Sequence, residues 1–166
     1  PLDAFKLTIA QKAESLCVLS VIKEKWDSKV KGRTMADSST QHGKYSKEET
    51  GSPMISNDAL FLTIMIDTYE NHDVATADIT GAYLHANMKD FVSLHFTSWA
   101  VDLLCEVNPE YQQHVVHEGK TKALYVHCSK AIYGCIMSGL LLYELFTSTL
   151  EALGFTVNPY DFCVAN

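Results

Sequence analysis

The chain has 166 residues, of which 47% are hydrophobic and 20% are charged, and its formal net charge is −7. This length suffices for one sizeable core or for two small lobes, and the composition is too apolar for a disordered chain. The longest apolar runs fall far short of the ~20 residues that a membrane span requires, so no transmembrane helix is predicted.

Charge is unevenly distributed along the chain. Residues 1–50 contain nine Lys/Arg and seven Asp/Glu, a net +2, whereas residues 51–166 contain four and thirteen, a net −9. A mildly basic segment beside an acidic, metal-attracting one is compatible with a polyanionic substrate, although the basic segment is weak beside those of nucleic-acid-binding domains.

The cysteines and the N-terminus bear on the compartment. Five cysteines are present and no two lie two or four residues apart, so free, buried thiols in a reducing compartment are favoured over a zinc site or disulfides. The first residues show no secretory signal, and the missing initiator Met indicates a fragment. The cysteines are Cys17, Cys105, Cys128, Cys135 and Cys163.

In chain order, apolar residues at helical spacing predict an amphipathic helix over residues 8–25. Alternating cations predict an exposed strand over 29–34, and the polar composition of 37–53 predicts a mobile loop. Ser56 or Asn57 then caps a predicted core helix. Short strands at 73–79 and 91–96 and a helix at 99–107 follow.

The polar stretch 110–122 predicts a loop. It contains His114 and His117, whose spacing suits a metal ion on a helix, but without a third ligand nearby a solvated loop is favoured. Further on, the chain predicts a strand at 123–127, a helix at 138–153 capped by Ser138 and ended by Gly154, and a turn leading into a last strand near the C-terminus.

Asp78 is the most suggestive single residue. It stands at the end of the predicted strand 73–79 and is followed by Gly81 and Tyr83. A carboxylate at a strand end can bind a divalent cation through hard oxygen ligands, and it can equally be a helix cap or a turn residue. The pattern alone leaves both interpretations open.

Five groups of residues are spread along the chain. Together, and in the order in which they follow one another, they resemble the reverse transcriptase of copia-type LTR retrotransposons, which is an RNA-directed DNA polymerase. The resemblance covers about residues 13–164. The groups are Lys29–Arg33 with Gln41, Glu49–Pro53, Asp78–His85, Leu124–Val126 with Lys130–Gly134, and Leu153–Phe155 with Asp161.

The resemblance implies an α+β fold: the fingers and part of the palm of a right-hand polymerase, with an incomplete ferredoxin-like palm sheet backed by helices. It places residues 1–70 and 91–135 in the fingers. It places two segments in the palm. Residues 71–90 contain the first catalytic aspartate, and residues 136–166 contain a palm helix and the start of the next strand. Palm strands are expected at 74–79 and near 163–166.

The resemblance also implies a chemistry, in which two Mg²⁺ ions serve nucleotidyl transfer in the intact enzyme. Asp78 would be the catalytic metal ligand and the carbonyl of Ile79 would help to hold the nucleotide-side ion. Tyr83 would exclude a 2′ hydroxyl from the sugar site. Lys31 and Arg33 would bind the triphosphate, unless they are solubilising charges of an edge strand.

The implied partners are an RNA or DNA template with its primer, deoxynucleoside triphosphates, and the rest of the polyprotein, which contains the remaining palm and RNase H. No membrane partner is implied. The implied location is the cytoplasm, in a virus-like particle, or the nucleus.

Two departures from the family pattern bear on activity. The Tyr-x-Asp-Asp hairpin, which supplies the other metal carboxylates in the family, is absent from these 166 residues, so the chain alone is expected to be catalytically incomplete. Residues 137–140 replace a Gln-Ala-Pro-Arg-like run, which puts template handling in doubt. The alternative is a non-catalytic α+β domain that binds nucleic acid or protein, with Asp78 as a structural cap.

Overall fold

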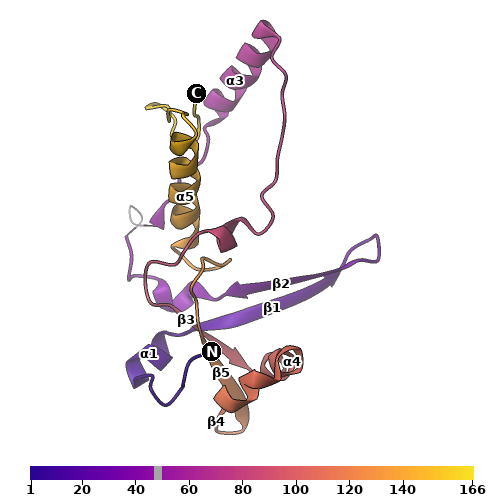
Figure 1. Cartoon of the computed structure of the whole chain (residues 1–166), viewed down its shortest axis with the longest axis vertical. Coiled ribbons are helices and arrows are strands. Elements are labelled where there is room, and N and C mark those ends of the chain that lie inside the picture. Colours follow the sequence, from indigo (N-terminus) through magenta and orange to yellow (C-terminus); the bar gives the residue numbers. More distant parts are fainter. Residues whose placement is uncertain (47–49) are drawn as a thin grey trace.

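The computed structural model describes residues 1–46 and 50–166 and has an α+β fold built on one five-stranded mixed sheet (Figure 1). The strand order is β2-β1-β3-β5-β4; β1 runs parallel to β3, and the other neighbouring pairs are antiparallel. The strands are β1 Leu16–Glu24, β2 Val30–Ala36, β3 Ser93–Thr97, β4 Val116–Glu118 and β5 Thr121–His127.

Helices connect and flank these strands. The α-helices are α1 Ile9–Glu14, α3 Asn57–Glu70, α4 Trp99–Val107 and α5 Ser138–Ala152. The short 3-10 helices within residues 1–46 and 50–166 are η1 Ser38–Gln41, η2 Ala82–His85 and η3 Pro109–His114. No helix among the residues that the structure describes is long and apolar enough to cross a membrane.

The predicted helix over residues 8–25 is wrong beyond its first turns. Thr8 and Gln11 form a capping box that begins α1, but the helix ends at Glu14 and β1 follows at once. Residues rich in β-branched side chains then pair along the whole hairpin, from Val18 opposite Ala36 to Glu24 opposite Val30. The strand predicted over 29–34 is confirmed by β2.

Most of the core lies at the sheet. One cluster joins the start of β1 and β3 to the loop before α5, a second packs under β5, and a third lies where η2 meets α5. The largest fully buried side chains among the described residues are Leu16, Leu124 and Val101, of which Val101 comes from α4. The strand and helix predicted at 91–96 and 99–107 are confirmed by β3 and α4.

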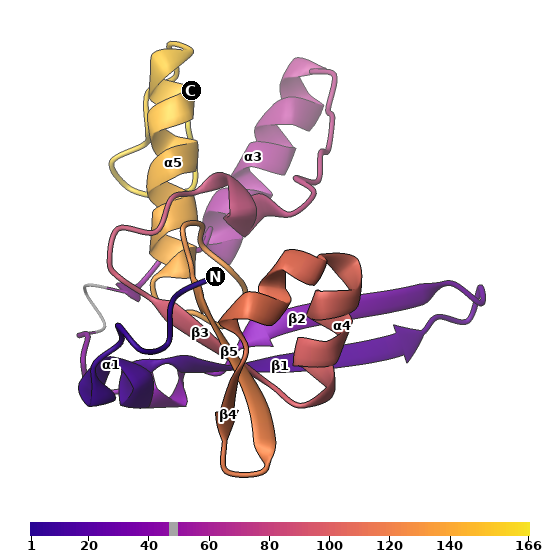
Figure 2. The same cartoon turned by 60° about the horizontal axis from the view of Figure 1, so that its bottom comes forward.

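Helix α3 begins as predicted, because the hydroxyl of Ser56 accepts a hydrogen bond from the amide of Ala59 at 3.1 Å. The expectation that it is a core helix is wrong, since none of its residues is buried. Helices α3 and α5 rise from the sheet on the same side (Figure 2). In α5 only Ser138 and Leu141 are buried, and the hydroxyl of Ser138 donates to the carbonyl of Ile132 rather than capping the helix.

The expected palm strands are not formed. Residues 73–79 have no regular structure, and near the C-terminus a single bridge joins Val157 to Ala165. A strand needs a neighbour to satisfy its backbone groups. No described segment pairs with residues 73–79, and residues 164–166 pair only with the short stretch 156–158. The prediction of a loop at 110–122 is also wrong, because η3, β4 and the start of β5 occupy this stretch. The loop predicted at 37–53 is interrupted by η1, and its residues 47–49 lie outside the described residues.

All five cysteines are free, but the expectation that they are buried holds only in part. Cys128 and Cys135 are buried in the core, whereas Cys17 and Cys163 are exposed. Burial raises the pKa of the Cys135 thiol to about 12, so this thiol stays protonated and unreactive at neutral pH.

Candidate functional site

Asp78 lies in the irregular segment between α3 and η2. Its side chain is exposed, and it forms no hydrogen bond or ion pair with any residue that the structure describes. A structural cap would show a hydrogen bond from its carboxylate to a backbone amide, as Ser56 does at α3. With respect to the described residues, Asp78 is therefore a carboxylate without a partner, and it neither caps a helix nor ends a strand.

Ile79 and Tyr83 share a hollow of about 300 Å³ with one face of α5. Gly81 adopts a left-handed conformation, with φ 62°, and so turns the chain into η2, which carries Tyr83. The far wall comes from Leu142 and Phe146 of α5. The hollow is mostly apolar, which suits a ring or a sugar face better than a charged group.

Tyr83 meets a second aromatic residue that comes from another part of the chain. Its ring packs edge to face against Tyr133, with the ring centroids 4.6 Å apart and the planes at 81°. Because Tyr83 and Tyr133 belong to two separate motifs of the resemblance, the fold brings these motifs into contact.

The backbone of Tyr133 and Gly134 also docks onto the end of β2. The amide of Ala36 donates to the carbonyl of Tyr133 at 2.8 Å, and a Cβ on Gly134 would overlap the carbonyl of Ala36. The strand that carries Arg33 is thus fixed to the same loop that touches Tyr83. The contribution of Tyr133 was not predicted from the sequence, although it lies inside a recognised motif.

Lys31 and Arg33 lie on β2, and both side chains are exposed. They line a hollow of about 490 Å³ along the β1–β2 hairpin, together with Trp26. The hairpin projects from the body of the molecule (Figures 1 and 2), and Trp26 is fully exposed. Residues 21–33 contain five cations and two acids, a net +3 in a chain whose net charge is −7.

The predicted site residues therefore fall into two groups. Ile79 and Tyr83 line one hollow, and Lys31 and Arg33 line another. Asp78 lines neither, although it directly precedes Ile79. The docking of Gly134 on β2 links the two groups through the backbone, without bringing their side chains into one cavity among the described residues.

The described residues do not by themselves fit a pair of magnesium ions. Residues 1–46 and 50–166 contain no group of three His, Cys, Asp or Glu side chains that could hold a metal ion. Asp78 offers a single carboxylate, whereas a two-metal site needs several oxygen ligands. His114 and His117, the other ligands weighed from the sequence, lie on η3 and β4 respectively.

Comparisons with protein-family models, with curated proteins and with solved structures give no match. The resemblance to copia-type reverse transcriptases therefore rests on the sequence motifs alone.

Proposed function

We propose that this chain is part of the RNA-directed DNA polymerase of a retrotransposon, with fingers formed by the sheet and α3 and a partial palm formed by η2 and α5. The observation that supports this most is the convergence of the motifs. Tyr83 touches Tyr133, Ser52 and Pro53 line the hollow of Tyr83, and Gly134 docks against β2. Residues that are far apart in the sequence and belong to separate motifs thus form one connected structure.

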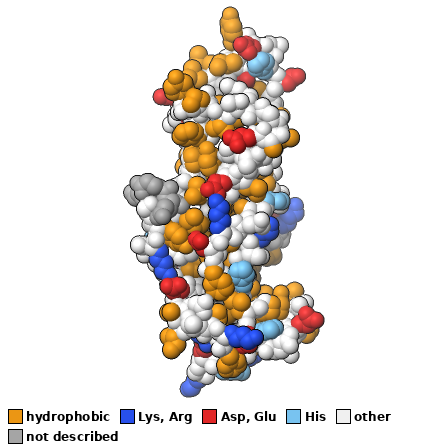
Figure 3. All heavy atoms as spheres, turned by 60° about the vertical axis from the view of Figure 1, so that its left-hand side comes forward, with side chains coloured by type: hydrophobic (Ala, Val, Ile, Leu, Met, Phe, Trp, Pro, Cys, Tyr) orange, Lys and Arg blue, Asp and Glu red, His pale blue; other side chains and the backbone are white. Residues whose placement is uncertain are grey.

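The exposed apolar surface of α3 and α5 supports the same proposal. Hydrophobic side chains gather over the upper part of the molecule in Figure 3, where these helices lie. Exposed apolar surface of this extent marks an interaction site. The proposal supplies its partner: the remaining palm packs against these helices. The exposed residues on α3 are Leu60, Phe61, Leu62, Ile64, Met65, Ile66 and Tyr69, and those on α5 are Leu145 and Phe146.

In the intact enzyme, the roles of the named residues follow from their chemistry. Arg33 and Lys31 bind the triphosphate, because a guanidinium grips two phosphate oxygens and neither side chain is paired with a described acid. Tyr83 meets the sugar, its ring held by Tyr133. Asp78 provides one metal ligand. The family's other metal carboxylates are not among these 166 residues, so the chain alone should not extend a primed template.

A chimera tests this proposal. These 166 residues would replace the corresponding segment of an active copia-type reverse transcriptase, which supplies the Asp-Asp hairpin. We expect magnesium-dependent extension of a primed template, and Asp78→Asn should reduce it by at least about 10³-fold because a metal ligand is lost. Tyr83→Val should raise the incorporation of ribonucleotides.

Asp73→Asn is the matched control, because Asp73 is an exposed acid of the same irregular segment and is not part of the motif. It should leave extension unchanged. A folded chimera that extends no primer, or one that extends it equally well with Asp78→Asn, would contradict the polymerase proposal.

The projecting basic hairpin favours a second candidate, a non-catalytic nucleic-acid-binding domain. The five cations of residues 21–33 on this exposed hairpin suit the charged backbone of a nucleic acid. This candidate predicts a salt-dependent affinity of the isolated chain for an RNA–DNA duplex that Asp78→Asn leaves unchanged, because counterion release depends on cations and not on that carboxylate. A metal-dependent loss of affinity in the same variant would favour the polymerase.

A further inference from the structure

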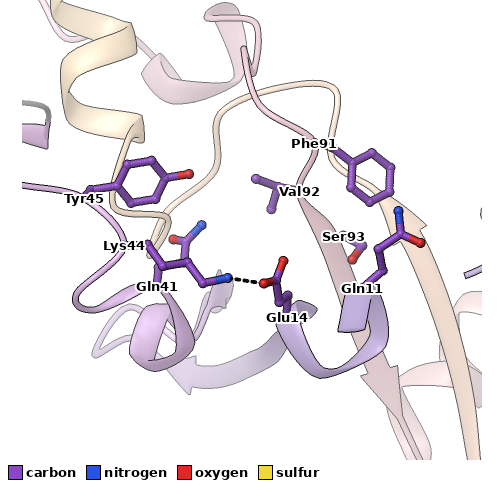
Figure 4. Close-up of a pocket in the computed structure, with 8 residues that line it drawn as sticks. All are labelled: Gln11, Glu14, Gln41, Lys44, Tyr45, Phe91, Val92 and Ser93. Atoms are coloured by element: carbon purple, nitrogen blue, oxygen red, sulfur yellow. Dashed lines mark ion pairs between the residues drawn. The ribbon is translucent and has the colours of Figure 1, made fainter. Parts of the chain in front are cut away.

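A third, polar hollow lies apart from the two hollows described above. It has a volume of about 310 Å³ and is enclosed by α1, by the chain that follows η1, and by the start of β3. Figure 4 shows Tyr45 and Gln41 on one side, and Phe91, Gln11 and Ser93 on the other. This volume is at the lower end of the range for small-molecule sites, so it suits one small ligand rather than a chain segment.

Two amide groups offer hydrogen-bond donors to this hollow. The Oε1 of Gln41, a buried side chain, accepts from the amide of Ile136 at 3.2 Å. The Oε1 of Gln11 accepts from the amide of Thr8 at 2.9 Å. The oxygen of each side chain is thus occupied, and neither Nε2 bonds to a described residue. Both NH₂ groups are available to a ligand.

Two hydroxyl groups offer acceptors. The hydroxyl of Ser15 donates to the carbonyl of Gln11 at 2.9 Å, so Ser93 must be the donor in its 2.6 Å hydrogen bond with Ser15. The oxygen of Ser93 keeps its free lone pair. The hydroxyl of Tyr45 likewise donates to Asp90 at 3.1 Å. Burial, and then this hydrogen bond, raise the pKa of Tyr45, so it remains a neutral hydroxyl with a free lone pair.

The charges around the hollow cancel. Lys44 and Glu14 form an ion pair at 2.9 Å, and the other lining side chains are neutral (Figure 4). A phosphate, a carboxylate or a metal ion would therefore find no unpaired counter-charge among the side chains that line the hollow. The ring of Phe91 and the side chain of Val92 add an apolar surface, and Phe91 is held by stacking on His127, with the ring centroids 5.2 Å apart.

We propose that this hollow binds a nucleobase. A nucleobase is neutral and planar, and it carries both carbonyl acceptors and N–H donors, which match the two amides and the two hydroxyl oxygens. Its face can lie against Phe91. The base can belong to a free nucleotide or to a single strand. The inference goes beyond the proposed polymerase, because none of the residues to which that proposal gives a role lines this hollow.

The test measures binding to the full 166-residue chain. The ligands are the four nucleoside monophosphates, a short single-stranded RNA of mixed sequence, and the duplex of that RNA. Dissociation constants come from titrations followed by the backbone amide signals of Ser93 and Tyr45. Phe91→Ala should weaken binding by about five-fold or more, through loss of stacking. Its matched control is Phe5→Ala, because Phe5 is exposed and lies outside the hollow.

Gln11→Glu is a sharper second variant. A glutamate keeps the oxygen that caps α1 but replaces the NH₂ donor by an acceptor, so α1 should remain intact while binding weakens by about five-fold or more. Gln112→Glu, an exposed change of equal charge on η3, is its control and should leave binding unchanged.

Either of two results supports the inference. Binding of monophosphates that both variants weaken identifies a free nucleotide as the source of the base. Binding of the single strand alone, with the same losses, identifies a strand. The inference is overturned if neither ligand shifts these amides, if both variants bind as tightly as the native chain, or if the duplex binds as well as the single strand, because its bases are paired.

Discussion

At the scale of single residues, Gly134 has the clearest structural reason to be what it is. Its φ of 91° lies in the left-handed region, and any Cβ there would overlap the carbonyl of Ala36. Both the conformation and the close approach require glycine. The position matters beyond its own backbone, because it fixes the loop that carries Tyr133 to the strand that carries Arg33.

We therefore expect Gly134→Ala to destabilise the protein. Backbone strain alone costs about 1–3 kcal/mol, and the steric overlap adds to it. Urea unfolding measures the change in the free energy of unfolding. Gly32→Ala is the control, since Gly32 lies on β2 with open space around it and should change stability by less than ~1 kcal/mol. Equal stability of the two variants would show that the loop does not dock as described.

At the scale of elements, local signals located two helix ends correctly, whereas Ser138 does not cap α5 as predicted. The cap at Ser56 and the left-handed Gly154 after α5 could be read from the sequence. The helix expected over 8–25 failed because the same apolar residues also suit a strand, and the pairing with β2, which the sequence does not show, decided between them.

The candidate site was partly predictable for the same reason. Motifs located Asp78, Tyr83 and Arg33, but no local pattern indicated that Tyr133 would pack on Tyr83 or that Gln41 would face a hollow. Both depend on contacts between distant segments. The lack of burial on α3 was also beyond the sequence, because an apolar helix pattern does not reveal whether its partner is present.

Asp161 ties two elements together and makes their contact sensitive to pH. Its carboxylate accepts hydrogen bonds from the amide of Ser56, at the start of α3, and from the amide of Cys163, both at 2.9 Å. These bonds hold the pKa of Asp161 below its usual value of 3.8. A lowered pKa means that the tether is at full strength above that value and is lost as the pH falls through the folded pKa.

We expect the protection factor of the Ser56 amide, which is the ratio of its intrinsic to its observed exchange rate, to fall as the pH drops below about 4. Asp161→Asn should abolish this pH dependence, because an asparagine does not titrate. Asp37→Asn is the control: the pKa of Asp37 is also lowered, by its hydrogen bonds with Ser39, but it lies far from α3 in the sequence. An unchanged profile in Asp161→Asn would rule out the tether.

At the scale of the whole molecule, burial is concentrated at one end. The sheet and the loops around it contain the buried clusters, whereas α3 contains no buried residue and is tied by the hydrogen bond from Ser56 to Asp161. An isolated helix of this length is marginal in water, and most helical stability in proteins comes from packing. The two ends of the molecule should therefore differ in local stability.

Hydrogen exchange of the native protein tests this division directly. Amides of β5, such as that of Leu124, should exchange slowest, because the Leu124 side chain is buried and β5 pairs with β3 from Ala123 to His127. Amides in the middle of α3 should exchange much faster, at a rate close to that of an isolated helical peptide without tertiary packing. The measurement belongs at low protein concentration, since self-association through the apolar face of α3 would protect it. If α3 is as well protected as β5 in a dilute monomer, the expected difference in local stability is contradicted. If protection of α3 appears only when a palm partner is added, the protected residues identify the surface through which α3 packs against it.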